Sequence, residues 1–274
     1  ISNGKWIWWS RGIGGRSALD YLIKVKGYSF LEAVETIIGH TAIQAPVYEK
    51  PQLKEENKPL LLPEKCASNR VITEYLFRRG IDFEIINYCI SNDLIFESLP
   101  YHNVVFVGYD EKKEPKYAAY RSTNKRRIMG DCSGSKKDYS FRLGKENLEE
   151  VHLFECAIDL LSYATFAKLN GQDWKEMSFV SLSGVYSPAK KIEDSKVPIA
   201  LEKYLGSNPS VRKIRIHFDN DIAGRKAAQT LKIILPDKYE IVDEPPKAGK
   251  DFNDFLCMQM GIYNKKTHER NEER

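Results

Sequence analysis

The sequence has no closely paired cysteines. Its five cysteines are widely spaced and form no CxxC pair, namely Cys66, Cys89, Cys132, Cys156 and Cys257. Paired spacings of that kind carry most zinc motifs and disulfide frameworks. Scattered cysteines favour reduced, partly buried thiols, so we expect a cytoplasmic protein.

Long apolar runs are missing too, and so is an excess of one charge. No stretch approaches the roughly 18 apolar residues of a membrane span, so we expect no membrane partner. The first residues, ISNGKWIWWSRG, show neither a secretory signal nor an initiator methionine, and we expect a piece of a longer protein. A net charge of +4 leaves room for a basic groove and an acidic site on one chain.

The 274 residues suffice for one large domain or two small ones. Residues 1–43 begin with an aromatic strand signal, WIWW, and continue with helical spacing of apolar residues. Residues 44–65 hold four prolines and many charges, which is typical of a linker. Residues 66–150 predict two amphipathic helices, a hairpin and a basic loop rich in glycine and serine, hence a small α+β subdomain.

From residue 151 the pattern alternates between strands and helices. HLFECAID, SFVSLSG, KIRIHFDND and KYEIVDEPP predict strands, each followed by a helical segment. Such alternation indicates an α/β fold with a parallel sheet and ligands at the carboxyl ends of its strands. We assign residues 151–260 to this domain and residues 261–274 to a charged tail.

Acidic residues follow three of these strands. Glu155 comes after VHLF, Asp219 and Asp221 come after IRIHF, and Asp251 follows KYEIV and a short loop. Carboxylates at the same edge of a sheet can hold Mg²⁺ together with substrate phosphates. The alternative for any single one is a helix cap or a turn residue. The whole set in strand-end register favours a metal site.

These segments resemble a known family. LFECAIDLLSYATF, HFDNDIAGRKAA and GKDFNDFL resemble the motifs of a Toprim domain, the catalytic fold of bacterial DnaG-type primases, topoisomerases and some nucleases. The resemblance implies Glu155, Asp219 and Asp221 as catalytic residues and a Mg²⁺ or Mn²⁺ cofactor. It implies as metal ligands Glu155, Asp219, Asp221, Asp251 and Asn253, with motif support from Asp159, Gly224, Arg225, Lys250 and Asp254. One departure is Cys156, where the family usually has glycine, and the larger side chain narrows backbone access to the site.

The segment before the Toprim-like part is similar to the small subdomain that precedes Toprim in these primases. Residues 66–258 look like the Toprim proteins carried by plasmids and integrative elements of Gram-positive bacteria, whose upstream domain has no assigned function. The lysine and arginine side chains of the segment before the Toprim-like part could bind nucleic-acid phosphates, and the aromatic ring of Tyr139 could stack on a base. We expect nucleic-acid contacts from Arg121, Lys125, Arg126, Arg127, Lys136 and Lys137. The alternative is a solvated basic loop.

The N-terminal segment resembles the second half of the primase zinc ribbon. Aligning its paired glycines puts Trp8 and Arg11 where two cysteines would stand. Tetrahedral zinc needs cysteine or histidine ligands, so we expect no zinc. Packing of Trp6, Trp8 and Trp9 is the favoured replacement for the metal, and stacking on bases is the alternative.

The resemblance as a whole implies a primase-like nucleotidyltransferase that acts on single-stranded DNA with nucleotides, serving a mobile element. Replication or conjugation proteins would be its partners. The main alternative is a Toprim module that binds single-stranded DNA without catalysis. A Toprim nuclease fits less well because the primase-like subdomain is present, and a topoisomerase fits least because the chain offers no large gate domain.

Overall fold

The computed structural model describes residues 6–8, 13–38, 58–125, 127–184, 186–189 and 191–262. Trp9, Arg11, Arg126, most of the linker at 44–65 and most of the tail at 261–274 lie outside these residues. The chain divides into two compact units, Ile1–Glu56 and Asn57–Arg274. No helix in the described ranges is both long enough and apolar enough to span a bilayer.

The first unit is small. Strand β1 (Trp6–Trp8) pairs antiparallel with β2 (Ile13–Gly15), and helices α1 (Ala18–Lys24) and α2 (Phe30–Ile38) follow. Ser17 caps α1 by accepting from the N–H of Asp20. The ring of Trp6 packs edge-on against Tyr21 at 5.3 Å between centroids, and its indole N–H donates to the Ser17 carbonyl. Trp6 therefore has a packing role here.

The second unit contains a five-stranded sheet in the order β11-β10-β8-β9-β7. Strands β8, β9, β10 and β11 run parallel, which confirms the predicted α/β fold. Strand β7, which comes before the other strands of this sheet along the chain, pairs antiparallel with β9 at the edge. The sequence did not predict this strand. Their bounds are β7 Arg142–Gly144, β8 Glu150–Phe154, β9 Ser178–Ser181, β10 Lys213–Ile216 and β11 Glu240–Asp243.

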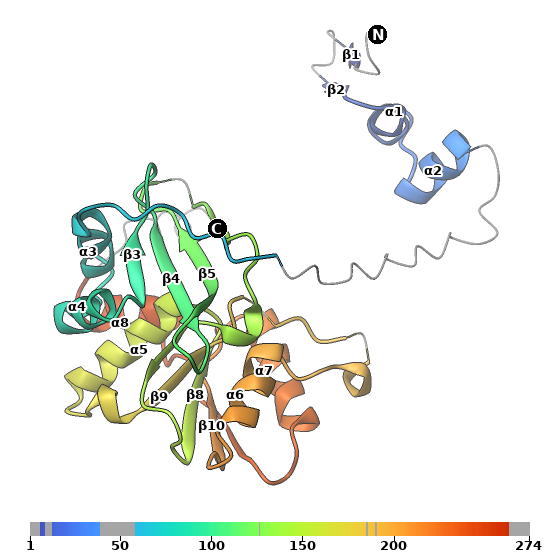
Figure 1. Ribbon diagram of the computed structural model, residues 1–274. Coiled ribbons are helices and arrows are strands. Elements are labelled where there is room, and N and C mark those ends of the chain that lie inside the picture. The colour runs from blue at the N-terminus through green and yellow to red at the C-terminus, as the bar shows by residue number, and fades with distance from the viewer. Residues whose placement is uncertain are drawn as a thin grey trace. The chain divides into compact units, whose positions relative to one another are not determined.

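Helices cover both faces of this sheet (Figure 1). One face packs on α5 (Ala157–Leu169) and α8 (Phe252–Gln259), the other on α6 (Ile199–Ser207) and α7 (Ile222–Ile234). Side chains alternate along each strand, so Phe154 of β8 joins the first layer and Leu153 the second. Short 3₁₀ turns lie at Lys137–Tyr139, Trp174–Glu176 and Ile192–Asp194.

A second sheet precedes the first along the chain. It is antiparallel, in the order β3-β4-β5-β6, with helices α3 (Arg70–Phe77) and α4 (Phe83–Ser91) before it. Its strands are β3 Ile95–Glu97, β4 Val104–Tyr109, β5 Pro115–Arg121 and β6 Met129–Asp131. Buried residues of α3, α4, β4, α5 and α8 form one continuous core. The α+β part is thus packed firmly against the helical layer of the parallel sheet.

Candidate metal and nucleic-acid site

The predicted acidic residues meet at the carboxyl edge of the parallel sheet. Glu155 directly follows β8, and Asp219 and Asp221 follow β10, the neighbouring parallel strand. Asp251 precedes α8, and the backbone N–H of Asn220 donates to the Lys250 carbonyl over 2.7 Å. That bond holds the Lys250–Asp251 turn beside the Asp219–Asp221 turn.

Two of these aspartates also cap helices. Asp221 accepts from the N–H of Gly224 at the start of α7, over 2.9 Å. Asp251 accepts from the N–H of Asp254 at the start of α8, over 2.7 Å. The capping interpretation therefore holds for both residues. In Asp221 it engages only Oδ1 and leaves Oδ2 directed at Lys250.

The ammonium group of Lys250 lies between two of the carboxylates. Its Nζ is 3.1 Å from Oδ2 of Asp219 and 3.3 Å from Oδ2 of Asp221. Hydrogen bonding to Asp219 raises the pKa of Lys250. Burial raises the pKa of Asp219, while the Gly224 N–H lowers that of Asp221. These residues gather oxygen donors and negative charge around one positive group, so they fit a divalent metal in charge and donor type.

Glu155 is the most crowded of the carboxylates. It is 5% exposed and accepts one backbone N–H, from Asp219 at 3.3 Å. Burial, and next the charge of Asp219, raises the pKa of Glu155 to about 7. A Cβ at Gly224 would lie 2.2 Å from the Asp219 carbonyl and 2.9 Å from Oε1 of Glu155. Only glycine lets α7 start so close to this edge.

A buried network behind the edge fixes α8. Asp159 of α5 accepts from the thiol of Cys156 at 2.8 Å and from the N–H of Asn253 at 3.2 Å. Burial and the nearby Asp251 raise the pKa of Asp159. The amide oxygen of Asn253 accepts from Arg79 at 2.7 Å, and its NH₂ donates to Ser162 and to the Arg79 carbonyl. Asn253 thus turns into the protein and ties α8 to the α3–α4 turn.

The edge is open in its present arrangement. Among the described residues, these carboxylates do not bring three oxygens within 4.8 Å of one another. The negative charges of the carboxylates repel one another. The Lys250 ammonium offsets this repulsion only between Asp219 and Asp221.

A cavity of about 290 Å³ lies beside Cys156, between the two sheets. It is lined by aromatic side chains of the antiparallel sheet, among them Tyr117 and Tyr120, and by Ser183 and Gly184 after β9. Two of the predicted nucleic-acid residues also line it, Arg121 at the end of β5 and Lys137. Lys137 forms an ion pair with Asp131 over 3.1 Å.

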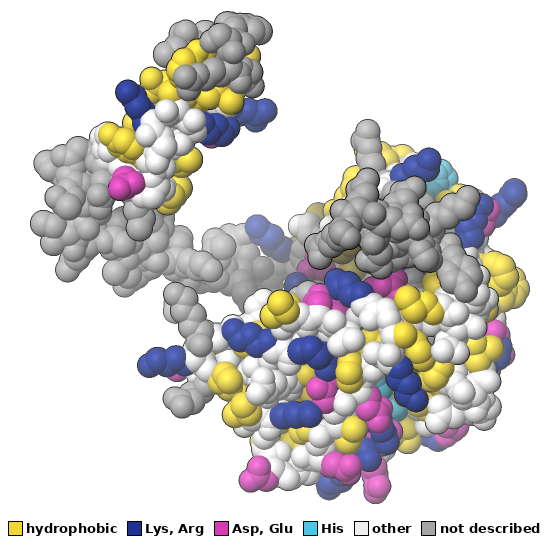
Figure 2. Space-filling model, turned by 180° about the vertical axis from the view of Figure 1, so that it is seen from behind, with side chains coloured by type: hydrophobic (Ala, Val, Ile, Leu, Met, Phe, Trp, Pro, Cys, Tyr) yellow, Lys and Arg dark blue, Asp and Glu magenta, His cyan; other side chains and the backbone are white. Residues whose placement is uncertain are grey.

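The other predicted cations do not line this cavity. Lys125, Arg127 and Lys136 are exposed, and Arg126 is outside the described residues. The ring of Tyr139 lies under the ammonium of Lys203, 5.0 Å from it. On the face shown in Figure 2, Lys and Arg side chains of the larger unit are interspersed with Asp and Glu rather than gathered in one basic patch.

Two arginines have roles that the sequence did not reveal. Arg79 holds Asn253 from 174 positions away, and no local pattern connects them. Arg225 belongs to the expected Toprim-like motif, but the motif does not predict its contacts. It pairs with Asp243 of β11 at 2.7 Å and donates to the carbonyls of Phe218 and Asp219. It therefore fixes the end of β10 against β11.

Comparison with solved structures finds several primase fragments at low identity. The primase fragment of the bacteriophage T7 primase-helicase protein is 18% identical, covers 68% of this chain and 69% of its own, and has a TM-score of 0.46. The E. coli primase catalytic core is 12% identical, with coverages of 74% and 72% and a TM-score of 0.45. The zinc-binding and RNA polymerase domains of Aquifex aeolicus primase are 15% identical, with coverages of 95% and 71% and a TM-score of 0.42.

None of the curated proteins matches the chain. Two family models do match it. Residues 74–147 match a family described as protein of unknown function (DUF3991), which agrees with the upstream domain expected from the sequence. Residues 152–256 match the Toprim-like family, over the stretch that carries Glu155, Asp219, Asp221 and Asp251. Together with the parallel sheet and its acidic edge, this match identifies residues 152–256 as a Toprim-like domain.

Proposed function

We propose that this protein is a primase-like nucleotidyltransferase that joins nucleotides on a single-stranded DNA template. The observation that carries the proposal is the meeting of four carboxylates at one sheet edge, those of Glu155, Asp219, Asp221 and Asp251, beside a cavity lined by Arg121 and Lys137. Phosphoryl transfer needs positioned phosphates and compensation of their negative charge.

The four carboxylates are the proposed metal ligands. They offer only oxygen donors, which suit Mg²⁺ or Mn²⁺. A bound ion of this kind would supply positive charge to the reacting phosphates. Asn253 has its amide oxygen on Arg79, so we assign it to positioning α8 and Asp251 rather than to ligation. Asp159 and Asp254 support the same helix start.

The cavity is the proposed place for a nucleotide. Its 290 Å³ lies near the lower end of the range of ligand pockets. Arg121 and Lys137 offer charge for phosphates, and Tyr117 and Tyr120 offer aromatic surface for a base. The exposed Lys125, Arg127 and Lys136, together with Arg126, would extend the path of the template backbone.

The test is ribonucleotide incorporation on single-stranded DNA with Mg²⁺ or Mn²⁺. We expect Asp219→Asn to lose more than about 100-fold in rate, since even outer-shell partners of a metal site cost 10–100-fold. Asp237→Asn is the matched control, because Asp237 is exposed in the loop between α7 and β11. Full activity in Asp219→Asn rules the proposal out.

One observation favours a second candidate, a Toprim module that binds single-stranded DNA without catalysis. Cys156 replaces the usual glycine next to Glu155, and its partly buried thiol donates a hydrogen bond to Asp159. Burial raises the pKa of this thiol well above its usual value, so the group stays neutral. DNA binding that weakens steeply with salt, without product under any nucleotide mixture, would select this candidate. Under either candidate we propose replication or transfer of a mobile element as the setting.

A further inference from the structure

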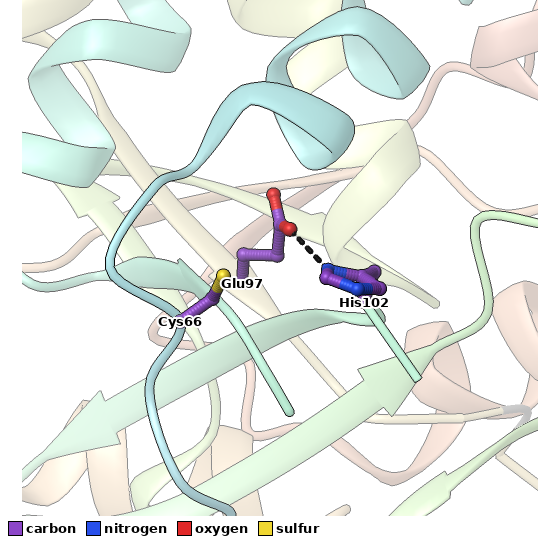
Figure 3. A group of neighbouring side chains, drawn as sticks. All are labelled: Cys66, Glu97 and His102. Carbon is purple, nitrogen blue, oxygen red and sulfur yellow. Dashed lines mark hydrogen bonds and ion pairs between the residues drawn. The ribbon is translucent and has the colours of Figure 1, made fainter. Parts of the chain in front are cut away.

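A second cluster of metal-ligating side chains lies in the antiparallel part of the larger unit. Cys66 precedes α3, Glu97 ends β3, and His102 belongs to the loop between β3 and β4. One ligand atom from each, Sγ, a carboxylate oxygen and a ring nitrogen, lie within 4.8 Å of one another. Figure 3 shows the thiol and the imidazole on either side of the Glu97 side chain.

Backbone hydrogen bonds bring these three residues together. The N–H of Cys66 donates to the Glu97 carbonyl at 2.8 Å, and that of Leu99 donates to the Glu64 carbonyl at 2.8 Å. Residues 64–66 therefore run beside the end of β3 like a short extra strand. The following loop turns back, because the N–H of His102 donates to the Ser98 carbonyl at 2.8 Å. This turn places the imidazole over Glu97.

Glu97 is the fixed member of the cluster. It is 2% exposed, and its Oε2 accepts from the backbone N–H groups of Val71 and Ile72 at the start of α3. Its own N–H donates to the side chain of Asn69 at 2.8 Å. The remaining oxygen, Oε1, faces Nδ1 of His102 at 2.6 Å. A buried carboxylate held in this way presents one oxygen in a defined direction.

His102 is held in an unusual backbone conformation. Its φ of +51° lies in the left-handed region, which costs a non-glycine residue free energy and persists only where surrounding bonds impose it. Its side chain remains 46% exposed, so the ring can still adjust its position.

We propose that Cys66, Glu97 and His102 bind one Zn²⁺ ion, with water as the fourth ligand. Thiolate and imidazole are ligands that zinc accepts and magnesium does not, and three protein ligands plus water is an established zinc arrangement. In a tetrahedral site the ligand atoms stand roughly 3.4–3.6 Å apart. The exposed imidazole, now 2.6 Å from Oε1, therefore moves away from it on binding. Binding releases the thiol proton to solvent, and it requires the neutral imidazole whose N–H lies on Nε2, so that Nδ1 is free to ligate.

Such an ion would fasten residues 64–66 to β3, where the chain enters the larger unit. The expectation of no zinc rested on the N-terminal segment, where Trp8 and Arg11 stand in place of ligands. Cys66 showed no zinc motif in the sequence either, because Glu97 and His102 lie 31 and 36 positions away from it without paired spacing. The cluster is thus independent of the acidic edge and of the proposed nucleotidyl transfer.

Cobalt binding tests the site. The full chain is stripped of metal with a chelator and titrated with Co²⁺ in the presence of excess Mg²⁺, which occupies oxygen-only sites. We expect one Co²⁺ per chain with a thiolate-to-cobalt charge-transfer band, which Zn²⁺ abolishes. Cys66→Ser should lose the band, and Cys132→Ser, which changes another half-buried cysteine, should keep it. Absence of the band, or its presence in Cys66→Ser, overturns the proposal.

Thermal unfolding gives a readout that does not depend on cobalt. At Zn²⁺ about 100-fold above Kd, the wild type should melt roughly 5 °C higher than the metal-free protein. Cys66→Ser and His102→Ala should lose most of this shift, whereas Cys132→Ser should retain it. An equal shift in Cys66→Ser and wild type would assign the zinc effect to other residues and refute the site.

Discussion

The larger unit buries two glutamates to a similar extent in very different surroundings. Glu97 is 2% exposed and Glu155 is 5% exposed. Glu97 accepts from two backbone N–H groups and faces an imidazole. Glu155 accepts one long backbone bond and lies beside the charges of Asp219 and Asp221.

The two surroundings differ in how far they compensate the negative charge of the carboxylate. The protein itself satisfies the charge of Glu97, so this side chain stabilises the start of α3. The charge of Glu155 is opposed by burial and by like charges, which raises its pKa to about 7. A bound cation from solution would stabilise the ionised form of this carboxylate. We therefore expect substitution of Glu97 to lower the free energy of unfolding and substitution of Glu155 to raise it.

The largest effect should come from Glu97→Ala. The variant loses three hydrogen bonds to one charged group, two of them from the first turn of α3. We expect the metal-free protein to lose about 3 kcal/mol of unfolding free energy. For a unit of this size that loss corresponds to roughly 6–12 °C in Tm, measured by calorimetry.

Glu64→Ala is the matched control for that loss. Glu64 is exposed two positions before Cys66, and surface changes usually remain within about 0.5 kcal/mol. A Tm of Glu97→Ala within 2 °C of wild type would show that the cap and the ion pair contribute little, and the contrast between the glutamates would fail.

A smaller effect of opposite sign should appear in Glu155→Gln without metal. The folded-state pKa of about 7 lies above the ordinary value of 4.5. Between these values the folded protein holds a proton that the unfolded chain has released, so stability falls as pH rises from about 4.5 to 7. Glutamine does not incur this loss. The variant should be about 1 kcal/mol more stable at pH 8, after allowance for solvent screening, and equal to wild type at pH 4.

Thermal unfolding at both pH values with a chelator checks this expectation. Glu149→Gln is the control, since Glu149 is exposed just before β8 and lies at the other end of the strand. Adding Mg²⁺ at pH 8 should stabilise the wild type more than Glu155→Gln, because the variant lacks a proposed ligand. A variant that is less stable than wild type at pH 8 would mean that the Glu155 charge is already satisfied.

Much of the parallel sheet was predictable from local pattern. The alternation of apolar strands and amphipathic helices after residue 151 identified β8 to β11 and their order along the chain. It also predicted that Glu155, Asp219, Asp221 and Asp251 would face one edge, because the carboxyl ends of parallel strands lie together. Strand β7 was not predicted, because its three residues, RLG, are too few to show the alternation of apolar and polar side chains that marks a strand.

What the sequence could not show depends on distant pairs. Asn253 had the position of a metal ligand in the motif, yet Arg79, far away in the chain, binds its amide oxygen. Cys66, Glu97 and His102 meet only because residues 64–66 pair with the end of β3. The capping bonds of Asp221 and Asp251 show a further reason, since one side chain can serve both a helix and a site.

The smallest effect should be seen in Lys250→Met, which removes the ammonium that lies between Asp219 and Asp221. Lys250 is 57% exposed, so each ion pair contributes at most about 1 kcal/mol. Because Mg²⁺ no longer has to displace an internal cation, we expect it to bind about fivefold more tightly to the variant. Calorimetric titration measures this affinity, with Lys247→Met as the control, because Lys247 is an exposed lysine in the same loop. Unchanged or weaker Mg²⁺ binding in Lys250→Met would show that the ammonium does not hold the place of the metal, and that Mg²⁺ binds elsewhere along the edge.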